Sequence, residues 1–229
     1  MKEGLIERIR AYGYWRINFR PLSLPEKQLL LGKCREIVVK SSVSIRGWDF
    51  PSISHRNDEH GGFSNEDNYV EDWTELQGFN EFWRLYSSSQ FLAYVALRED
   101  TMPEAHGNPK MRILITTSAV YEISEFLEFC HRLFKNGLYK DGLRLTLSLE
   151  NTRGRILAAG WQRMPFPDRK QTNAERIELT ELIYPERLAE EHRNISVDLC
   201  LRLFDRFGWN PDPTQIRAEQ ERFYRKDWR

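Results

Sequence analysis

The sequence predicts an α+β domain in which a mostly antiparallel sheet packs against several amphipathic helices. Residues 14–20 and 143–149 alternate apolar and polar side chains with a period of two, which is typical of half-buried strands. Residues 117–135 and 185–207 instead carry apolar stripes at helical spacing. Because the 229 residues contain no internal repeat, low-complexity tract or clear linker, we expect residues 1–229 to form a single domain.

The first quarter of the chain predicts two helices that alternate with two strands. Gly13 is a stop signal for the first helix, and Pro21 ends the strand that follows it. In the second helix Cys34, Ile37 and Val38 share one apolar stripe. The predicted elements are a helix over 2–12, a strand over 14–20, a helix over 25–40 and a strand over 42–46.

The middle of the chain predicts two long loops separated by short elements. Turn-forming residues without periodicity indicate a loop over 51–68, and two prolines with a glycine indicate a mobile loop over 99–109. Between these loops we expect a strand over 69–73, a short helix over 79–86 and a strand over 90–98.

The second half contains the clearest helix of the chain, over 117–135, in which Val120, Ile123 and Leu127 belong to the apolar stripe. Strict alternation over 143–149, a turn at 151–154 and an apolar return over 155–158 predict a β-hairpin. The remaining expectations are a polar loop over 160–174, a short strand over 176–179, a helix over 185–207 and a terminal helix over 214–226.

The overall charge excludes a strong global attraction to polyanions. The chain has 34 Lys and Arg against 34 Asp and Glu, so its formal net charge is +0, although a local basic face remains compatible with this balance. No segment approaches the roughly 18 consecutive apolar residues of a membrane-spanning helix, and the first residues lack the apolar run of a signal peptide. We therefore expect a cytoplasmic protein without a membrane partner.

The cysteine pattern and the absence of nucleotide-binding motifs further reduce the classes of function that the sequence allows. Cys34, Cys130 and Cys200 are odd in number and widely separated, and each lies in an apolar helical pattern, which indicates core residues in a reducing compartment. The chain has neither a Walker A loop nor a GxGxxG fingerprint, which makes dinucleotide or nucleotide-triphosphate binding by such motifs unexpected. We expect no cofactor.

The most informative segment is 41–51, which we expect to be a strand that runs into a tight, aromatic-lined turn containing Arg46, Gly47, Trp48 and Asp49. A glycine between a basic and an aromatic residue allows a ligand to approach closely, and the guanidinium of Arg46 would bind a phosphate or carboxylate group of that ligand. The alternative is structural, with Gly47 in a bulge, Trp48 packed and Arg46 paired with Asp49. Aromatic residues and arginine are enriched in binding hot spots. The binding surface that we expect comprises Arg46, Trp48, Asp49, Trp83 and Arg84.

The polar segment that follows is a candidate for metal chemistry. Divalent metals bind imidazole and carboxylate groups, and such a site would hydrolyse a phosphodiester. No HExxH, HxH or calcium-loop pattern is present, and a solvated loop explains the same composition. The candidate ligands and catalytic groups of this alternative are Asp49, His55, Asp58, His60 and Glu71.

Basic residues interleave with aromatic residues in two further stretches, one at 153–170 and one at the C-terminal end. Such mixtures suit nucleic-acid backbones and stacked bases, but they suit a protein partner or a solvated helix equally well. If nucleic acid binds, the expected contacts are Arg153, Arg155, Arg222, Arg225, Lys226 and Arg229. The three serines at 87–89 lack the GxSxG pattern of a nucleophile elbow.

Three segments together resemble a family of uncharacterised bacterial proteins of similar length. They are Val43–Pro51 with its Arg-Gly-Trp-Asp core, Trp83–Phe91, and the Leu-Phe-Asp-Arg-Phe-Gly-Trp run Leu203–Trp209. The resemblance spans most of the chain, and it implies a bacterial origin and a shared fold. It implies no catalytic residue.

Taken together, these patterns favour a non-catalytic binding or accessory module of a bacterial complex, with a role in defence against foreign nucleic acid. Another protein chain is the expected partner, and nucleic acid is the second. The alternative function is a metal-dependent hydrolase that acts on nucleic acid or a nucleotide.

Overall fold

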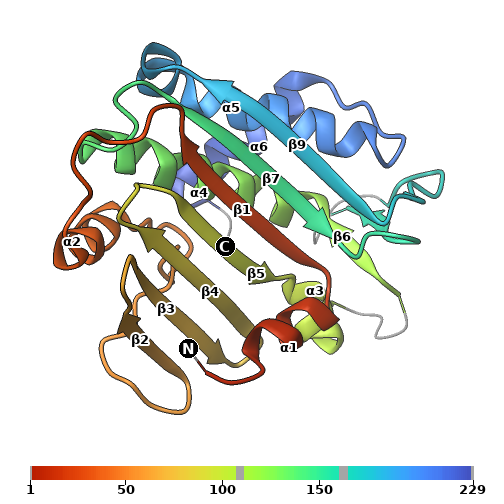
Figure 1. The fold of residues 1–229 in the computed structure, drawn as a ribbon. Coiled ribbons are helices and arrows are strands. Elements are labelled where there is room, and N and C mark those ends of the chain that lie inside the picture. Colours follow the sequence, from red (N-terminus) through yellow and green to blue (C-terminus); the bar gives the residue numbers. More distant parts are fainter. Residues whose placement is uncertain (1, 107–110, 160–164, 228–229) are drawn as a thin grey trace.

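The computed structural model describes residues 2–106, 111–159 and 165–227, and its central feature is a seven-stranded sheet (Figure 1). The strand order is β2-β3-β4-β5-β1-β7-β9, and every neighbouring pair is antiparallel. A separate two-stranded sheet pairs β6 with β8 in parallel. The predicted α+β class is therefore confirmed.

The bounds of the elements follow the chain. The strands are β1 (Tyr14–Pro21), β2 (Gly61–Asn65), β3 (Tyr69–Leu76), β4 (Phe79–Tyr86), β5 (Phe91–Ala96), β6 (Ile113–Ile115), β7 (Leu143–Glu150), β8 (Ile156–Ala158) and β9 (Arg176–Ile183). The helices are α1 (Leu5–Ala11), α2 (Leu31–Ser41), α3 (Arg98–Thr101), α4 (Thr116–Lys135), α5 (Pro185–Asp205) and α6 (Pro213–Arg225), with a 3₁₀ turn η1 (Pro103–His106).

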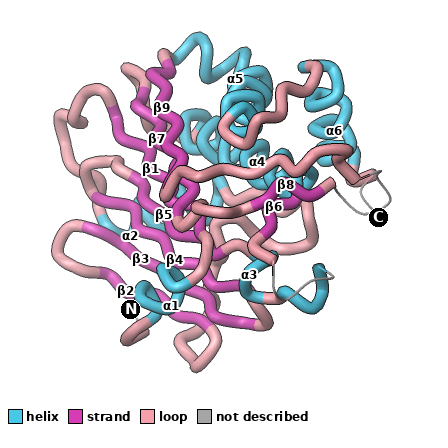
Figure 2. The backbone as a smooth tube through the Cα atoms, turned by 90° about the vertical axis from the view of Figure 1, so that its right-hand side faces the viewer, coloured by secondary structure: helices cyan, strands magenta, loops and turns pink. Residues whose placement is uncertain are grey.

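Helices cover the two faces of the large sheet unequally. Figure 2 shows α4, α5 and α6 stacked on one side of the sheet, whereas the short α1 lies on the other side. The main core forms beneath α4, where Phe126 and Phe129 pack against Phe50 with ring centroids 4.7 and 5.5 Å apart. On the opposite face Leu5 of α1 belongs to a smaller apolar cluster with Phe82. Burial of each such side chain contributes about 1.5–3 kcal/mol.

The structure corrects the prediction for residues 79–86, which form strand β4 and not a helix. Strand β4 pairs with β3 on one side and β5 on the other. Alternation is hidden in this segment because both faces are covered near its centre: Phe82 is buried toward α1, and Trp83 is buried toward α4. A strand buried on both faces loses the period of two.

Three further expectations are corrected. The predicted strand 42–46 is only a two-residue bridge between Val43 and Phe50, which closes a tight turn. The predicted loop 51–68 contains strand β2, and the predicted mobile loop 99–109 contains the end of α3 and η1, while 107–110 lie outside the described residues. Of the loop 160–174, residues 165–174 carry no helix or named strand, and 160–164 are not described.

The predicted hairpin 143–158 is also wrong in its pairing. Strand β7 lies between β1 and β9, whereas β8 joins β6 in the small parallel sheet. The side chain of Arg155, just before β8, donates to the carbonyl oxygen of Ile113 at 2.7 Å and to the carboxylate of Asp100. These contacts hold the segment against β6 and away from β7.

Two glycines before β7 differ in how closely the backbone of another segment approaches them. Gly142 and Gly137 both have a left-handed φ, +96° and +95°. A Cβ at Gly142 would lie 2.5 Å from the carbonyl oxygen of Ile183, whereas a Cβ at Gly137 would meet no atom within 4 Å. Both alanine variants carry the conformational cost of about 1 kcal/mol, but only Gly142→Ala adds a backbone clash.

We therefore expect Gly142→Ala to lower the free energy of unfolding by roughly 2 kcal/mol or more beyond the loss in Gly137→Ala. Denaturant unfolding of both variants measures this difference. Equal losses in the two variants would show that the carbonyl oxygen of Ile183 moves away at little cost.

Within the described ranges, no helix combines the length and the apolar character needed to cross a lipid bilayer.

Candidate functional site

The turn closed by Val43 and Phe50 presents the predicted Arg46-Gly47-Trp48 segment beside α4. The bridge is made by two backbone hydrogen bonds of 2.8 and 2.9 Å between Val43 and Phe50. Gly47 has a φ of +92°, and no atom lies within 4 Å of the position that its Cβ would occupy. The turn thus uses glycine for its backbone conformation, and it leaves open space above Gly47.

Arg46 forms a largely buried ion pair with Glu125 of α4, so the alternative pairing of Arg46 with Asp49 is not the one observed. Its guanidinium also lies over the ring of Trp48, 4.8 Å from the centroid. Burial raises the pKa of Glu125, and the nearby Asp49 carboxylate raises it further against the opposing effect of Arg46. Arg46 is therefore held in place by one charge and one ring.

Arg98, which the sequence reading did not single out, completes the site from the start of α3. Its guanidinium lies 5.0 Å from the ring centroid of Trp48 and 4.3 Å from that of Phe79. Its only hydrogen-bond acceptor among the described residues is the sulfur of Met102, at 3.8 Å, and its buried Nε has no partner. Burial lowers the pKa of Arg98, and the charge of Arg46 lowers it further.

Carboxylates at the rim of this site are bonded to other protein groups. Glu122 accepts a hydrogen bond of 2.7 Å from the indole of Trp15, and Glu99 accepts the backbone N–H of Ile115 at 3.1 Å. Burial, reinforced by the charge of Glu99, raises the pKa of Glu122 to about 7. Near neutral pH the local negative charge is therefore smaller than the number of glutamates suggests.

Arg46, Trp48 and Arg98 line two small hollows. The larger one, which we call the Trp48 cleft, has a volume of about 150 Å³. It is lined by Arg46, Trp48, Arg98, Glu99, Ser118, Tyr121 and Glu122. The smaller hollow, of about 30 Å³, reaches toward Phe79 and Glu81. The cleft is large enough for the end of one side chain or one small anion.

Trp83 and Arg84 do not belong to this cleft. Trp83 is fully buried beneath α4, and its indole donates to the carbonyl oxygen of Ser52 at 2.7 Å. Arg84 points to the opposite face of β4, where it donates to Glu71 at 2.8 Å and lies over the ring of Tyr69. Of the five predicted surface residues, the structure brings together only Arg46, Trp48 and Asp49.

The residues of the metal hypothesis are dispersed. Asp58 accepts the backbone N–H groups of His60 and Gly61 within its own loop, and the side chain of His60 is exposed. His55 is exposed as well, whereas Glu71 lies on β3 and pairs with Arg84. Across residues 2–106, 111–159 and 165–227, no three His, Cys, Asp or Glu side chains are grouped as a metal site would require.

The predicted nucleic-acid contacts divide between surface and interior. Arg153, Arg222, Arg225 and Lys226 are exposed, and Arg229 lies outside the described residues. Arg155 is 0% exposed and is bonded to both oxygens of Asp100, at 2.8 and 2.6 Å. It is therefore an interior residue and not a contact residue, because a nucleic-acid phosphate cannot reach it in this fold.

In the sequence, the candidate binding site was indicated by three consecutive residues of one turn, Arg46, Gly47 and Trp48. Arg98 gave no comparable signal, because it stands at the end of a predicted strand without a motif around it. The resemblance of three segments to bacterial proteins stays a prediction. No protein-family model matches the chain, and no curated protein or solved structure is significantly similar to it.

Proposed function

We propose that this protein is a non-catalytic binding module whose Trp48 cleft holds a carboxylate of a partner protein chain. The observation that carries the proposal is the guanidinium of Arg98. It lies against the rings of Trp48 and Phe79, which contact each other edge to face, and no carboxylate forms an ion pair with it in the part of the chain that the structure describes.

An anion in the cleft would add to the effect of Glu99 and Glu122, whose negative charges favour the charge of Arg98 without forming an ion pair with it. Arg46 lies over the same indole, 4.8 Å from its centroid, and its positive charge disfavours the charge of Arg98. A carboxylate placed between the two guanidinium groups would interact favourably with both and would give the orphaned Nε of Arg98 an acceptor. Charge-assisted hydrogen bonds of this kind contribute about 1.5–3 kcal/mol each.

The volume and the lining favour recognition of a side chain over turnover of a substrate. A volume of about 150 Å³ is below the roughly 300–1,000 Å³ of most small-molecule sites, and it suits the tip of one acidic side chain. Trp48 is partly exposed at the rim, where a partner surface would cover it. The wider roles, in a bacterial complex and in defence against foreign nucleic acid, stay predictions.

The proposal predicts that N-acetyl-glutamate amide binds and that its neutral counterpart, N-acetyl-glutamine amide, does not. Calorimetric titration of both compounds measures this difference. Arg98→Gln is expected to weaken binding of the glutamate compound about tenfold or more, because it removes the unpaired charge. Arg225→Gln, an exposed arginine on α6 that pairs with Glu221, serves as the matched control and is expected to bind normally.

Equal binding of the two compounds, or full binding by Arg98→Gln, would contradict the proposal. Metal-dependent cleavage of nucleic acid that Asp58→Ala abolishes would favour the hydrolase instead. Nucleic-acid binding that falls steeply with salt and requires Arg222 and Arg225 would favour the second expected partner.

A further inference from the structure

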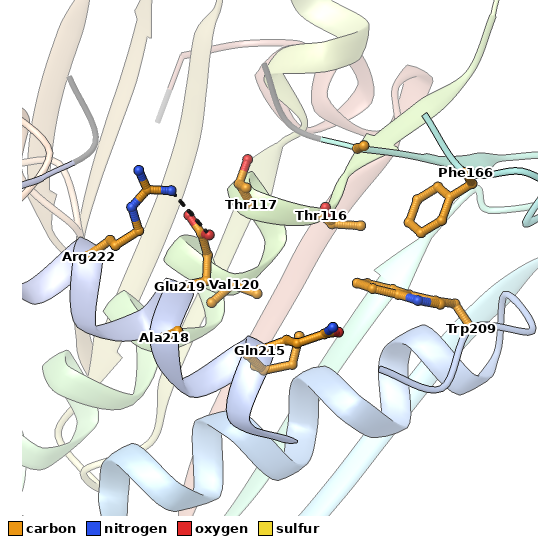
Figure 3. A pocket seen from close by; sticks show the side chains of 11 residues that line it. Thr116, Thr117, Val120, Phe166, Trp209, Gln215, Ala218, Glu219 and Arg222 are labelled. Atoms are coloured by element: carbon orange, nitrogen blue, oxygen red, sulfur yellow. Dashed lines mark ion pairs between the residues drawn. The ribbon is translucent and has the colours of Figure 1, made fainter. Parts of the chain in front are cut away.

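A second cavity, of about 530 Å³, lies on another side of α4 from the Trp48 cleft. It is enclosed by the start of α4, by α6 and by the segments that carry Phe166 and Trp209. Figure 3 shows Phe166 and Trp209 at one end, Glu219 and Arg222 at the other, and Thr116 and Thr117 between them. We call it the Trp209 cavity, and its volume lies in the usual range for small-molecule sites.

The aromatic end of the cavity offers a ring face to a ligand. Phe166 and Trp209 meet edge to face, with centroids 4.9 Å apart and an interplanar angle of 67°. Trp209 is held from behind by the buried ring of Phe204, at 4.9 Å, and is itself partly exposed. A fixed, partly exposed indole is a suitable platform for a planar aromatic ring.

The middle of the cavity offers hydrogen-bond donors that the protein does not use. The Thr116 side chain lines the cavity, and the residue is only 6% exposed, yet its hydroxyl makes no hydrogen bond within the described residues. Thr116 also begins α4, a helix of 20 residues that has no side-chain cap and no acidic residue in its first turn. The N–H of the N-cap residue Ile115 is already bonded to Glu99, whereas the N–H groups of the turn that follows, with the positive end of the helix dipole, favour an anion.

The charged end limits where that anion can lie. Glu219 accepts a hydrogen bond of 2.5 Å from the hydroxyl of Tyr121, and Arg222 approaches it at 3.9 Å. The Glu219 carboxylate would repel a second anion placed directly beside it. The side chain of Arg222 is 56% exposed, so it can turn toward a group at the start of α4 with little loss of packing.

We propose that the Trp209 cavity binds a small ligand that combines a planar aromatic ring with an anionic group. The ring lies against Trp209, and the anion accepts hydrogen bonds from the Thr116 hydroxyl and the first turn of α4. Two classes of compound share this chemistry, mononucleotides and aromatic carboxylic acids. The site is separate from the Trp48 cleft, which lies on the Ser118 and Tyr121 side of the same helix, although Tyr121 of the cleft donates to Glu219 of the cavity.

Calorimetric titrations with adenosine monophosphate and indole-3-acetate test the proposal, with adenosine and indole as the matched compounds that lack the anion. We expect at least one of the two anionic compounds to bind, about tenfold or more tightly than its neutral counterpart. Binding of the nucleotide alone identifies the first class of ligand, and binding of the carboxylate alone identifies the second.

Two variants connect the binding to this cavity. Thr116→Val removes the unused hydroxyl with little change of shape, and we expect it to weaken binding of the anionic compound about three- to tenfold. Ser118→Ala, in the same helical turn but on the side of the Trp48 cleft, should bind like the original protein. Trp209→Leu is expected to lose binding, with circular dichroism as the check that it folds.

The proposal is overturned if neither anionic compound binds below about 5 mM, or if Thr116→Val and a folded Trp209→Leu both bind unchanged. Loss of binding in Ser118→Ala but not in Thr116→Val would place the ligand in the Trp48 cleft and would equally overturn it.

Discussion

Replacement of Arg155 with methionine is expected to lower the free energy of unfolding by about 3–5 kcal/mol. The guanidinium is fully buried and donates to both oxygens of Asp100 and to the carbonyl oxygen of Ile113. Asp100 also accepts the backbone N–H of Gly13 at 2.6 Å, so this ion pair joins β6, the start of β1 and α3. Loss of Arg155 leaves a largely buried carboxylate without its countercharge.

Denaturant unfolding of Arg155→Met measures the loss, and Arg153→Met is the matched control two positions earlier. Arg153 and its partner Glu175 are 67% and 69% exposed, so we expect that control to lose less than about 1 kcal/mol. Adding Asp100→Asn to Arg155→Met should recover part of the stability, because it removes the uncompensated charge. A loss below about 1 kcal/mol in Arg155→Met would show that water reaches Asp100.

The free energy of unfolding is expected to fall as the pH rises from about 5 to about 8, and Glu81→Gln should remove much of that fall. Burial raises the pKa of Glu81 from 4.5 to about 8, despite hydrogen bonds from Ser52 that act in the opposite direction. The folded protein therefore retains a proton that the unfolded chain releases. Over this interval each pH unit favours the unfolded state by up to about 1.4 kcal/mol.

Glutamine keeps the neutral form of the side chain at every pH. Its oxygen still accepts the backbone N–H of Ser52, which lies 2.8 Å from Glu81 Oε1, and its amide can donate to the Ser52 hydroxyl. We expect the stability difference between Glu81→Gln and the original protein to grow with pH, by on the order of 3 kcal/mol between pH 5 and 8. Unfolding curves at several pH values measure it.

Glu178→Gln, on the exposed face of β9, controls for the loss of one glutamate from the sheet. Parallel stability curves for Glu81→Gln and the original protein across this pH range would contradict the expectation. They would mean that Glu81 is ionised in the folded protein, so that a cation or water must reach it.

The sequence predicted the elements in which apolar and polar side chains occupy different faces. The stripe of α4 is visible because polar residues such as Glu122 and Glu125 interrupt its apolar residues at helical spacing, although these glutamates are buried as well. The alternation of β1 and β7 is visible because successive side chains of a strand point to opposite faces. In β4 this signal fails, because Phe82 and Trp83 are buried on opposite faces. The prediction of which strands pair was wrong for a different reason. The attachment of β8 to β6 depends on Arg155 and its contacts with residues that are distant in the sequence.

In the candidate site, too, the sequence indicated the residues that are close together in the chain and missed those that come from distant segments. Arg46 and Trp48 could be singled out because they are neighbours on one glycine-containing turn. Glu125, which pairs with Arg46, and Arg98, which completes the cleft, come from distant segments that carry no local motif. Trp83 and Arg84 were grouped with them by composition, but adjacent residues of a strand point to opposite faces of the sheet.

By itself, the sequence determined the α+β class, the main helices, the strands β1 and β7 and the turn that carries Arg46 and Trp48. These depend on local periodicity and on residues close together in the chain. The tertiary structure decided which strands pair, which charges are buried and that Arg98 lines the cleft without an ion pair to any described carboxylate. Those properties depend on groups brought together from distant positions, and the interaction of two charges is set by their final separation and their exclusion from water.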